Sequence, residues 1–497
     1  MHKVANGILA FPLEIQSKIF TTVHRDNPRN EALRLPEEVV LSHVCSLWRD
    51  ISVNLPTLWT AFRFDSHLSA FPPLEKLDKY LHRSGIQLLE LYFNISSSDY
   101  FDGEMDDYEG FSDALNLVET TTAHAHRWRR FTFFTDQNSE INEVLDKICE
   151  IYAPNLEYFA MCPTLIDELP QVNGRCIDPT VLIGGAPKLS VARIDTTSHL
   201  LWLPPLSNIA TLTIQQSPAM QDFSFQICRS ILMIPTLKNL SIESAMNLDT
   251  VSMGNRESFC ILSPALKTLR IMQNHSILGI LSFLDAPFLE TVVLRDLDLA
   301  SVYINQDVHR ISSFKNLNTI SLLDCRCKLG DADPEGVSSD VIAMILNKLF
   351  HHATHIIFST IDDTPSEIER GTQLLNFNLF TWPRLQRITL DLPTLSDPKF
   401  YERNLQLSPH SITLRVVQPL LQHWKTRQPN DLRRLENVCE LKTMMVGDLI
   451  MGDPWPVSGG KFQEDEGFIT HINWGERLRA RGPPSILVSH LSRLLVR

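Results

Sequence analysis

Residues 263–271 read SPALKTLRI, in which a proline precedes a leucine by two positions and an alternating apolar pattern follows. Leu269 and Ile271 would share one face of an extended segment, because successive side chains of a β-strand point to opposite sides. Pro264 ends any preceding helix and cannot donate to a strand ladder. The stretch therefore predicts a half-buried strand that begins just after a proline-marked turn.

Related stretches recur through most of the chain. They are found at 153–159 (APNLEYF), 186–194 (APKLSVARI), 234–242 (IPTLKNLSI), 286–294 (APFLETVVL), 314–322 (FKNLNTISL) and 382–390 (WPRLQRITL), with a weaker copy lacking proline at 208–214 (NIATLTI). The leading leucines at 237, 266, 289 and 317 are separated by 29, 23 and 28 residues. Such steps lie within the range of leucine-rich repeats.

The segments between copies, such as 224–233 and 277–284, are expected to be helical or irregular. One strand and one return segment per repeat build a parallel-strand solenoid, or horseshoe, whose core forms only when neighbouring repeats stack. Residues 88–93 and 128–133 fit as degenerate first repeats. The alternative is a mixed α/β domain whose strands merely follow prolines.

The amino-terminal part has a helical pattern instead. It opens with FPLEI at 11–15, where Pro12 suits the first turn of a helix because its fixed φ is already helical. This helix is expected to end before Pro28, and its apolar face would contain Leu13, Ile15, Ile19, Phe20 and Val23.

A second helical stripe is predicted from i, i+3, i+4 and i+7 spacing. Its members are Val40, Leu41, Val44, Leu47, Trp48 and Ile51, with Cys45 on the same face. A third turn is expected from Pro56, with Leu58, Trp59 and Phe62 as apolar members. Three helices this short bury little surface alone, so they need a partner or another domain. Alternatively, they form an ordinary helical cap with Trp48 and Trp59 in its core.

Together, FPLEI at 11–15 and LSHVCSLWRDI at 41–51 resemble an F-box. With LHRSG at 81–85 and the repeats that follow, the chain resembles a large family of fungal F-box proteins with irregular leucine-rich repeats. The fold class implied is α/β, with a three-helix F-box at 1–65, an irregular leucine-rich-repeat solenoid at 66–438, and a loop plus capping segment at 439–497. The capping helix is expected at 485–496.

The resemblance implies a substrate-recognition subunit of a Skp–cullin–F-box ubiquitin ligase. Its F-box would bind a Skp-type adaptor and, through it, a cullin, while the repeats bind a protein substrate and the chain itself catalyses nothing. The implied adaptor contacts are Pro12, Leu13, Ile15, Ile19, Leu41, Val44, Cys45 and Trp48. Two alternatives are a non-degradative leucine-rich-repeat interaction scaffold and an enzyme on an α/β platform.

Composition limits the partners and the compartment. The net charge of −13 argues against a general nucleic-acid surface, and no run approaches the roughly 18 apolar residues of a membrane span. Nine cysteines without a Cys-x-x-Cys pair are typical of reduced thiols, so we expect a cytoplasmic or nuclear protein.

No catalytic, metal or cofactor site is expected from the motifs. His351 and His355 could share a helix face, but the Glu of a His-Glu-x-x-His zinc motif is missing. Cys325 and Cys327 are expected to be structural thiols, Asp331 and Asp333 to lie in a turn, and the acidic run at 99–113 to be a solvated loop or to contact a basic substrate. A phosphorylated substrate would require converging arginines, and strand positions are predicted for Arg193, Arg270 and Arg387.

Overall fold

The structure is a computed structural model. It describes residues 11–26, 36–65, 73–95, 108–135, 141–163, 177–195, 202–215, 225–243, 260–272, 281, 283–295, 297, 314–323, 325, 346–359, 382–391, 397–408 and 411–444. The predicted capping helix at 485–496, the acidic residues at 99–107 and the turn at 331–333 lie outside this part of the chain.

The described residues form two compact units, one of residues 11–64 and 73–92 and one of residue 65 and 93–444. The first unit therefore extends beyond the expected helical domain at 1–65. Its elements are α1 (Leu13–Asp26), α2 (Glu37–Val44), α3 (Ser46–Val53), the 3-10 helix η2 (Pro56–Trp59), β1 (Ala61–Asp65), α4 (Pro73–Ser84) and the first part of β2 (Leu89–Ile95).

Helix α1 begins where Pro12 predicts. The backbone N–H groups of Ile15 and Gln16 donate to the Pro12 carbonyl at 3.0 and 3.1 Å, so Pro12 supplies the first helical acceptor without needing a donor of its own. The amphipathic pattern of the first segment thus gives a helix close to its predicted position.

The single stripe predicted over 40–51 is wrong, because Cys45 adopts an extended conformation (φ −158°, ψ 171°) that separates α2 from α3. Its carbonyl accepts the N–H of Arg49 at 2.9 Å and so starts α3, while Arg49 Nε donates to the Ser42 carbonyl at 3.0 Å and satisfies the end of α2. The break divides the apolar residues between interior and surface. Leu41 and Ile51 are buried, whereas Val40, Val44 and Leu47 are exposed.

Aromatic contacts make the core of the first unit. Phe20 packs edge-on against Trp48, with ring centroids 4.8 Å apart, and Tyr80 meets Trp59 at 5.2 Å. The indole N–H of Trp59 donates to the Ser52 carbonyl at 2.7 Å, so this large side chain is buried with its polar group satisfied. Ring packing therefore holds α4 to η2, and the buried hydrogen bond holds η2 to α3.

The strands form a 14-stranded sheet in the order β1-β2-β3-β4-β5-β6-β7-β9-β11-β12-β13-β14-β15-β16, and the pairings from β3 to β16 are parallel. Two short strands, β8 (Ile261–Leu262) and β10 (Leu284–Asp285), pair separately. The remaining strands are β3 (Trp128–Thr135), β4 (Tyr158–Pro163), β5 (Val191–Asp195), β6 (Thr211–Gln215), β7 (Asn239–Glu243), β9 (Thr268–Met272), β11 (Thr291–Arg295), β12 (Thr319–Leu323), β13 (His355–Ser359), β14 (Arg387–Asp391), β15 (Thr413–Val417) and β16 (Glu440–Met444).

Each strand of the second unit gives equivalent residues to the core. Leu240 of β7 pairs with Leu269 of β9, which pairs with Val292 of β11. Two residues further along, Ile271 and Leu294 continue a second buried row. The strands predicted from the proline-leucine pattern are thus present and parallel, while β13, β15 and β16 were not predicted because their sequences lack it.

Turn residues before the strands connect neighbouring repeats. Asn155 Nδ2 donates to the His126 carbonyl at 2.8 Å, and Asn316 Nδ2 donates to the Pro287 carbonyl at 2.6 Å. The Thr236 hydroxyl likewise donates a hydrogen bond to the Ile209 carbonyl at 2.8 Å. These bonds satisfy turn carbonyls that cannot join the sheet ladder.

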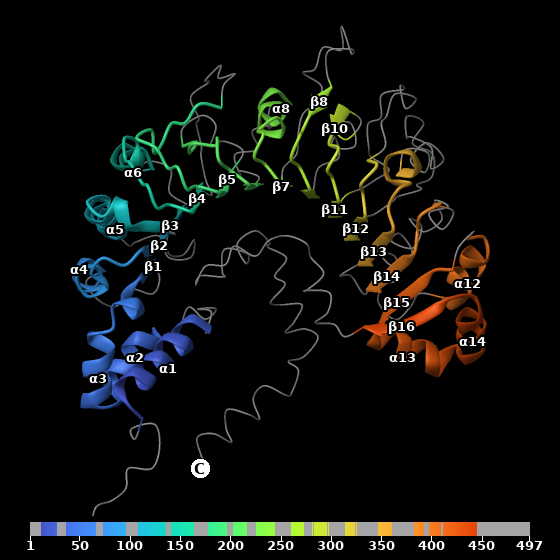
Figure 1. Ribbon diagram of the computed structural model, residues 1–497, viewed down its shortest axis with the longest axis horizontal. Helices are drawn as coiled ribbons and strands as arrows, with labels where there is room; N and C mark the ends of the chain where they lie inside the picture. Colours follow the sequence, from blue (N-terminus) through green and yellow to red (C-terminus); the bar gives the residue numbers. More distant parts are fainter. Residues whose placement is uncertain are drawn as a thin grey trace, which may run out of the picture. The chain divides into compact units, whose positions relative to one another are not determined.

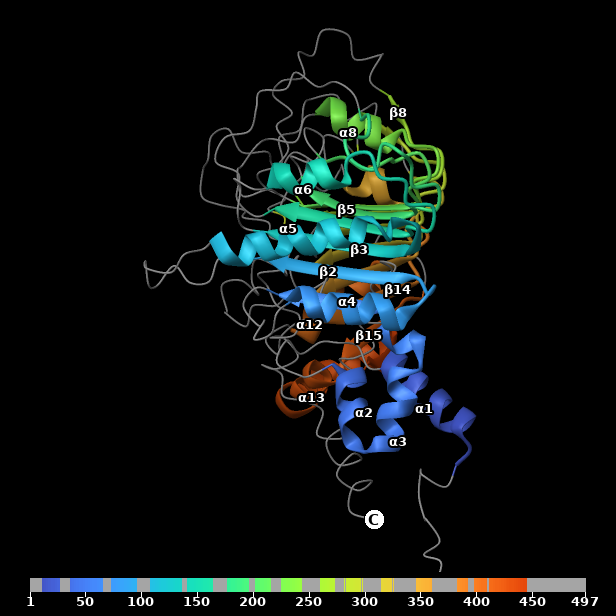
Figure 2. The ribbon, with the colours of Figure 1, turned by 90° about the vertical axis from the view of Figure 1, so that its left-hand side faces the viewer.

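Helices occupy several returns between strands. In the second unit they are α5 (Tyr108–Thr122), α6 (Ile141–Ile148), α8 (Phe225–Leu232), α12 (Pro398–Gln406), α13 (Gln418–Arg427) and α14 (Pro429–Val438), with a short 3-10 turn, η3 (Ala125–Arg127), before β3. Figure 1 shows α5, α6 and α8 on the same side of strands β3 to β7. Figure 2 shows α5 beside α6, and an ion pair between Glu119 and Lys147 joins the two helices at 3.0 Å. None of the described helices combines the length and apolar character needed to cross a membrane.

We expect Leu269→Ala to lower the free energy of unfolding by about 2–5 kcal/mol, because it leaves a cavity between two paired strands. Leu269 is buried in the row that β7, β9 and β11 share. Urea unfolding followed by circular dichroism would measure the loss. The exposed Lys238→Ala is the matched control, expected within about 0.5 kcal/mol of wild type; equal stabilities for the two variants would contradict the shared core.

Candidate functional site

Seven large apolar side chains of the first unit are exposed at or beside helices α1, α2 and α3. They are Phe11, Leu13, Ile15, Val23, Val40, Val44 and Leu47, here called the exposed apolar set. Leu13 and Val44 are each 55% exposed. Single exposed apolar residues are ordinary. Seven on and beside three short helices are a larger apolar exposure, of the kind that association with another molecule removes from water.

The predicted adaptor contacts differ in exposure. Pro12, Leu13, Ile15 and Val44 are exposed, while Ile19, Cys45 and Trp48 are half-buried. Leu41 is only 9% exposed, so it belongs to the interior and not to the exposed apolar set. Its place is taken by Val40 and Leu47, which the sequence analysis had put on the buried stripe.

The second candidate surface is the face of the sheet opposite the apolar rows. Side chains alternate along each strand, so Arg193 of β5, Glu243 of β7, Arg270 of β9 and Arg295 of β11 lie on that face. Burial raises the pKa of Glu243 above its ordinary value, while Arg270, Arg193 and Arg295 act in the opposite direction. Three arginines therefore converge on one carboxyl group.

The strand positions predicted for Arg193, Arg270 and Arg387 are confirmed, and of the three only Arg193 and Arg270 act on Glu243. Arg295 was missed because it ends its strand, beyond the alternating apolar positions that define the repeat. Arg193 is also held in place: its Nε donates to Gln215 Oε1 at 3.1 Å, and its guanidinium lies 5.1 Å from the Phe134 ring centre. This cluster contains a carboxyl group of its own and is largely buried.

A second, more open group lies on β13, β14 and β15. His355 and Arg387 are paired across neighbouring strands, and Thr389 is paired with Arg415. His355 Nε2 is 2.8 Å from Thr389 Oγ1. Arg387 is exposed and Arg415 half-buried, so both guanidinium groups can meet a ligand.

Burial, together with the nearby positive charges of Arg387 and Arg415, lowers the pKa of His355 to about 4. The imidazole is therefore neutral at pH 7, and the positive charge of the group comes from its two arginines. We call His355, Arg387 and Arg415 the open basic group. Its chemistry suits a carboxylate or phosphate oxygen.

The idea that His351 and His355 share a helix face is wrong. The helix described from residue 346 ends at Phe350, and His355 is the first residue of β13. The rings of His351 and His352 are 3.8 Å apart instead, and burial lowers the pKa of His352, helped by the charges of His351, Arg384 and Lys315. Cys325 is buried with Sγ 3.3 Å from the Leu294 carbonyl, which fits a structural thiol; Cys327 lies outside the described residues.

A cavity of about 710 Å³ lies between α3, η2 and α4 in the first unit. Its ionisable lining includes Glu75, Asp78, Lys79 and His82, all exposed side chains of α4. Glu75 and Lys79 form an ordinary i, i+4 ion pair at 3.8 Å. These groups have the character of a solvated helix face.

No protein-family model matches this chain, and a search of curated proteins found no significant similarity to any of them. The resemblance to F-box proteins with leucine-rich repeats therefore depends on the sequence motifs quoted above.

The neutral His355 should make stability depend on pH. An unfolded histidine has a pKa of 6.5, whereas the folded one accepts a proton only near 4, so the stabilising effect is complete above pH 6.5 and is lost as the pH falls toward 4. Between neutral pH and pH 5, we expect His355 to account for a loss of about 2 kcal/mol.

Urea unfolding of wild type and His355→Gln at about pH 7.5 and pH 5 would measure this contribution, since the glutamine cannot take up a proton. Wild type should lose more stability than the variant on acidification. The same pH dependence in both proteins would mean that His355 titrates normally when folded.

Proposed function

We propose that this chain is a substrate-recognition subunit of a Skp–cullin–F-box ubiquitin ligase. The observation that carries the proposal is the exposure of Leu13, Ile15 and Val44 on α1 and α2, within segments that resemble an F-box. Covering such side chains contributes about 25 cal/mol for each Å² removed from water, which favours a stable partner. That partner is a Skp-type adaptor, which connects the chain to a cullin.

The break at Cys45 supports the same assignment. It directs Val44 and Leu47 to the surface while Trp48 packs on Phe20, so one short motif supplies both a core anchor and exposed contacts. A helical cap would instead have Leu13 and Val44 buried. If the chain does not bind the adaptor, a helical cap on a non-degradative repeat scaffold becomes the better description.

In this role the chain acts by proximity. A client held on the sheet face brings its lysine close to a ubiquitin thioester carried by other subunits, which raises the effective concentration without catalytic groups from this protein. The open basic group favours a client with an anionic segment. The six described free cysteines fit a reducing compartment, and we place the protein in the cytoplasm or nucleus.

The Leu13→Asp/Val44→Asp variant should lose binding to a purified Skp-type adaptor. Both positions are 55% exposed, so the fold is expected to survive while two carboxylates would have to be buried in the interface. A pull-down with full-length protein measures the loss, and circular dichroism confirms folding.

Ile86→Asp is the matched control, because Ile86 is a 90% exposed apolar residue of the same unit outside α1–α3. It should bind the adaptor like wild type. Folded wild-type protein that does not bind the adaptor would overturn the proposal and leave a repeat scaffold.

The Arg387→Glu/Arg415→Glu variant should bind the adaptor normally but retain fewer clients. Quantitative mass spectrometry of proteins captured in the presence of a ubiquitination inhibitor would compare it with wild type and with Lys425→Glu, an exposed charge reversal on α13. Clients lost only in the double variant would support recognition by the open basic group. Identical client sets in all three proteins would exclude it.

A further inference from the structure

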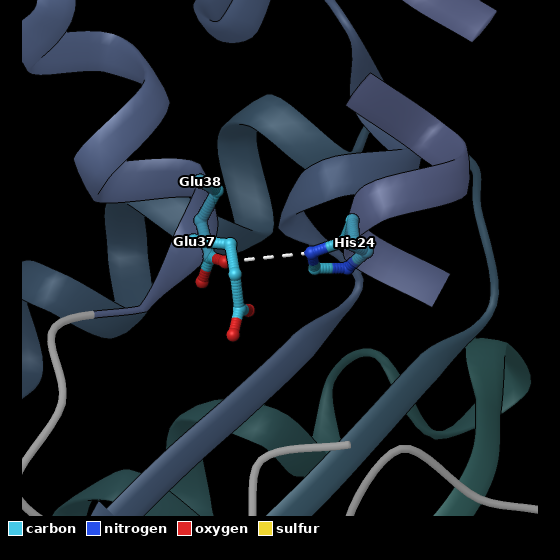
Figure 3. Close-up of side chains that lie close together, drawn as sticks. All are labelled: His24, Glu37 and Glu38. Atoms are coloured by element: carbon cyan, nitrogen blue, oxygen red, sulfur yellow. Dashed lines mark ion pairs between the residues drawn. The ribbon is translucent and has the colours of Figure 1, made fainter. Parts of the chain in front are cut away.

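A buried polar centre lies inside the first unit, where α1, α2 and α4 meet. His24 is 6% exposed and Glu38 is fully buried, and the Tyr80 hydroxyl donates to Glu38 Oε1. Figure 3 shows the ring of His24, near the end of α1, facing the Glu38 carboxylate at the start of α2, with Glu37 beside them and its carboxylate directed away. An imidazole and a carboxylate from two helices thus meet in the interior, with a second carboxylate within 4.8 Å of them.

The distance between His24 and Glu38 suits two ligands of one ion. His24 Nδ1 and Glu38 Oε2 are 3.5 Å apart, longer than the usual 2.7–3.2 Å of a direct N–H···O hydrogen bond. Two ligands on one tetrahedral Zn²⁺, with bonds of about 2.0–2.1 Å, are separated by about 3.3 Å. One ligand atom each from His24, Glu37 and Glu38 can be chosen so that all lie within 4.8 Å of one another. Two ligands of one Zn²⁺ lie at most about 4.2 Å apart, so a change of the Glu37 side-chain rotamer would complete the set.

The neighbours of these groups strengthen the case. The Tyr80 hydroxyl fixes the orientation of the Glu38 carboxylate through one oxygen and leaves the other directed toward His24. A hydrogen bond of this kind from outside the ligand set is what orients carboxylate ligands in metal sites. Glu37 is half-buried, so the centre can be reached from solvent on that side.

We propose that His24, Glu37 and Glu38 bind one Zn²⁺ ion, with water completing the coordination. An imidazole in the set favours Zn²⁺ over Mg²⁺ or Ca²⁺, which prefer oxygen ligands alone. The two carboxylates balance the charge of a divalent ion.

Binding would connect the end of α1 to the start of α2, on either side of residues 27–35. Because Leu13 lies on α1 and Val44 on α2, the ion would hold together the two helices that carry most of the exposed apolar set. The assignment concerns the first unit alone and holds whether or not an adaptor binds there.

Full-length protein treated with a chelator and then titrated with Zn²⁺ by calorimetry tests this site, with Co²⁺ absorption reporting the coordination geometry. Wild type should bind one equivalent, unfold at a higher temperature with Zn²⁺, and give the visible spectrum of four-coordinate Co²⁺. His24→Ala and Glu37→Gln should lose all three properties, and Tyr80→Phe should bind about 10-fold more weakly.

Glu14→Gln and His351→Ala are the matched controls, and both should behave like wild type. Glu14 is an exposed glutamate of α1, and His351 belongs to the histidine pair of the second unit. Because His24 is buried, circular dichroism must first show that His24→Ala is folded. If His24→Ala is unfolded, the Glu37→Gln variant, changed at a half-buried position, provides the test. The proposal is overturned if folded wild type binds no Zn²⁺, or if Glu37→Gln binds Zn²⁺ as well as wild type. His24 and Glu38 would then form only an ion pair.

Discussion

The second unit depends on one constraint, the constant parallel register of its strands. Each pairing from β5 to β14 places the same two apolar positions side by side, as Leu240, Leu269 and Val292 illustrate. No single strand of five residues can bury these side chains by itself, so stability arises from the contacts between neighbours. The register also fixes the opposite face, because side chains alternate, and so determines which polar residues become neighbours.

The arginine groups are a consequence of this arrangement. Arg193, Arg270 and Arg295 are far apart in the chain, yet all three act on Glu243 because their strands lie close together in one sheet. Likewise Arg387 and Arg415 act on His355 from the two strands that follow it. The first group encloses a buried carboxyl group and the second leaves two cations near solvent, so the same fold gives two arginine groups with different chemistry.

Much of the sheet could be predicted, because proline and alternating apolar residues are local signals. The strands β7, β9, β11, β12 and β14 follow directly from them. The break at Cys45 could not be predicted, since the apolar spacing of 40–51 continues through it and the extended conformation depends on capping by Arg49. For the same reason the sequence put Leu41 and Val44 on one face, whereas one is buried and the other exposed.

The polar sites were harder to predict because they form across long separations. Nothing in the sequence near His24 indicates that Glu38 and Tyr80 will surround it, since these residues come from three helices. The spacing of His351 and His355 is compatible with one helix face, although Ile356 and Phe358, which follow His355, already show the alternation of a strand. Local patterns thus gave most of the backbone, while the charge clusters required the tertiary structure.

The unequal spacing of the strands affects how this architecture can change over evolutionary time. From β9 to β14 the strands begin at residues 268, 291, 319, 355 and 387, so successive steps are 23, 28, 36 and 32 residues, yet the pairing does not shift. Lengthening a connection costs little, about 0.6 kcal/mol for each doubling of a flexible loop. Insertions can therefore accumulate between strands while the sheet stays in register, which lets the connecting segments change in length independently of the core.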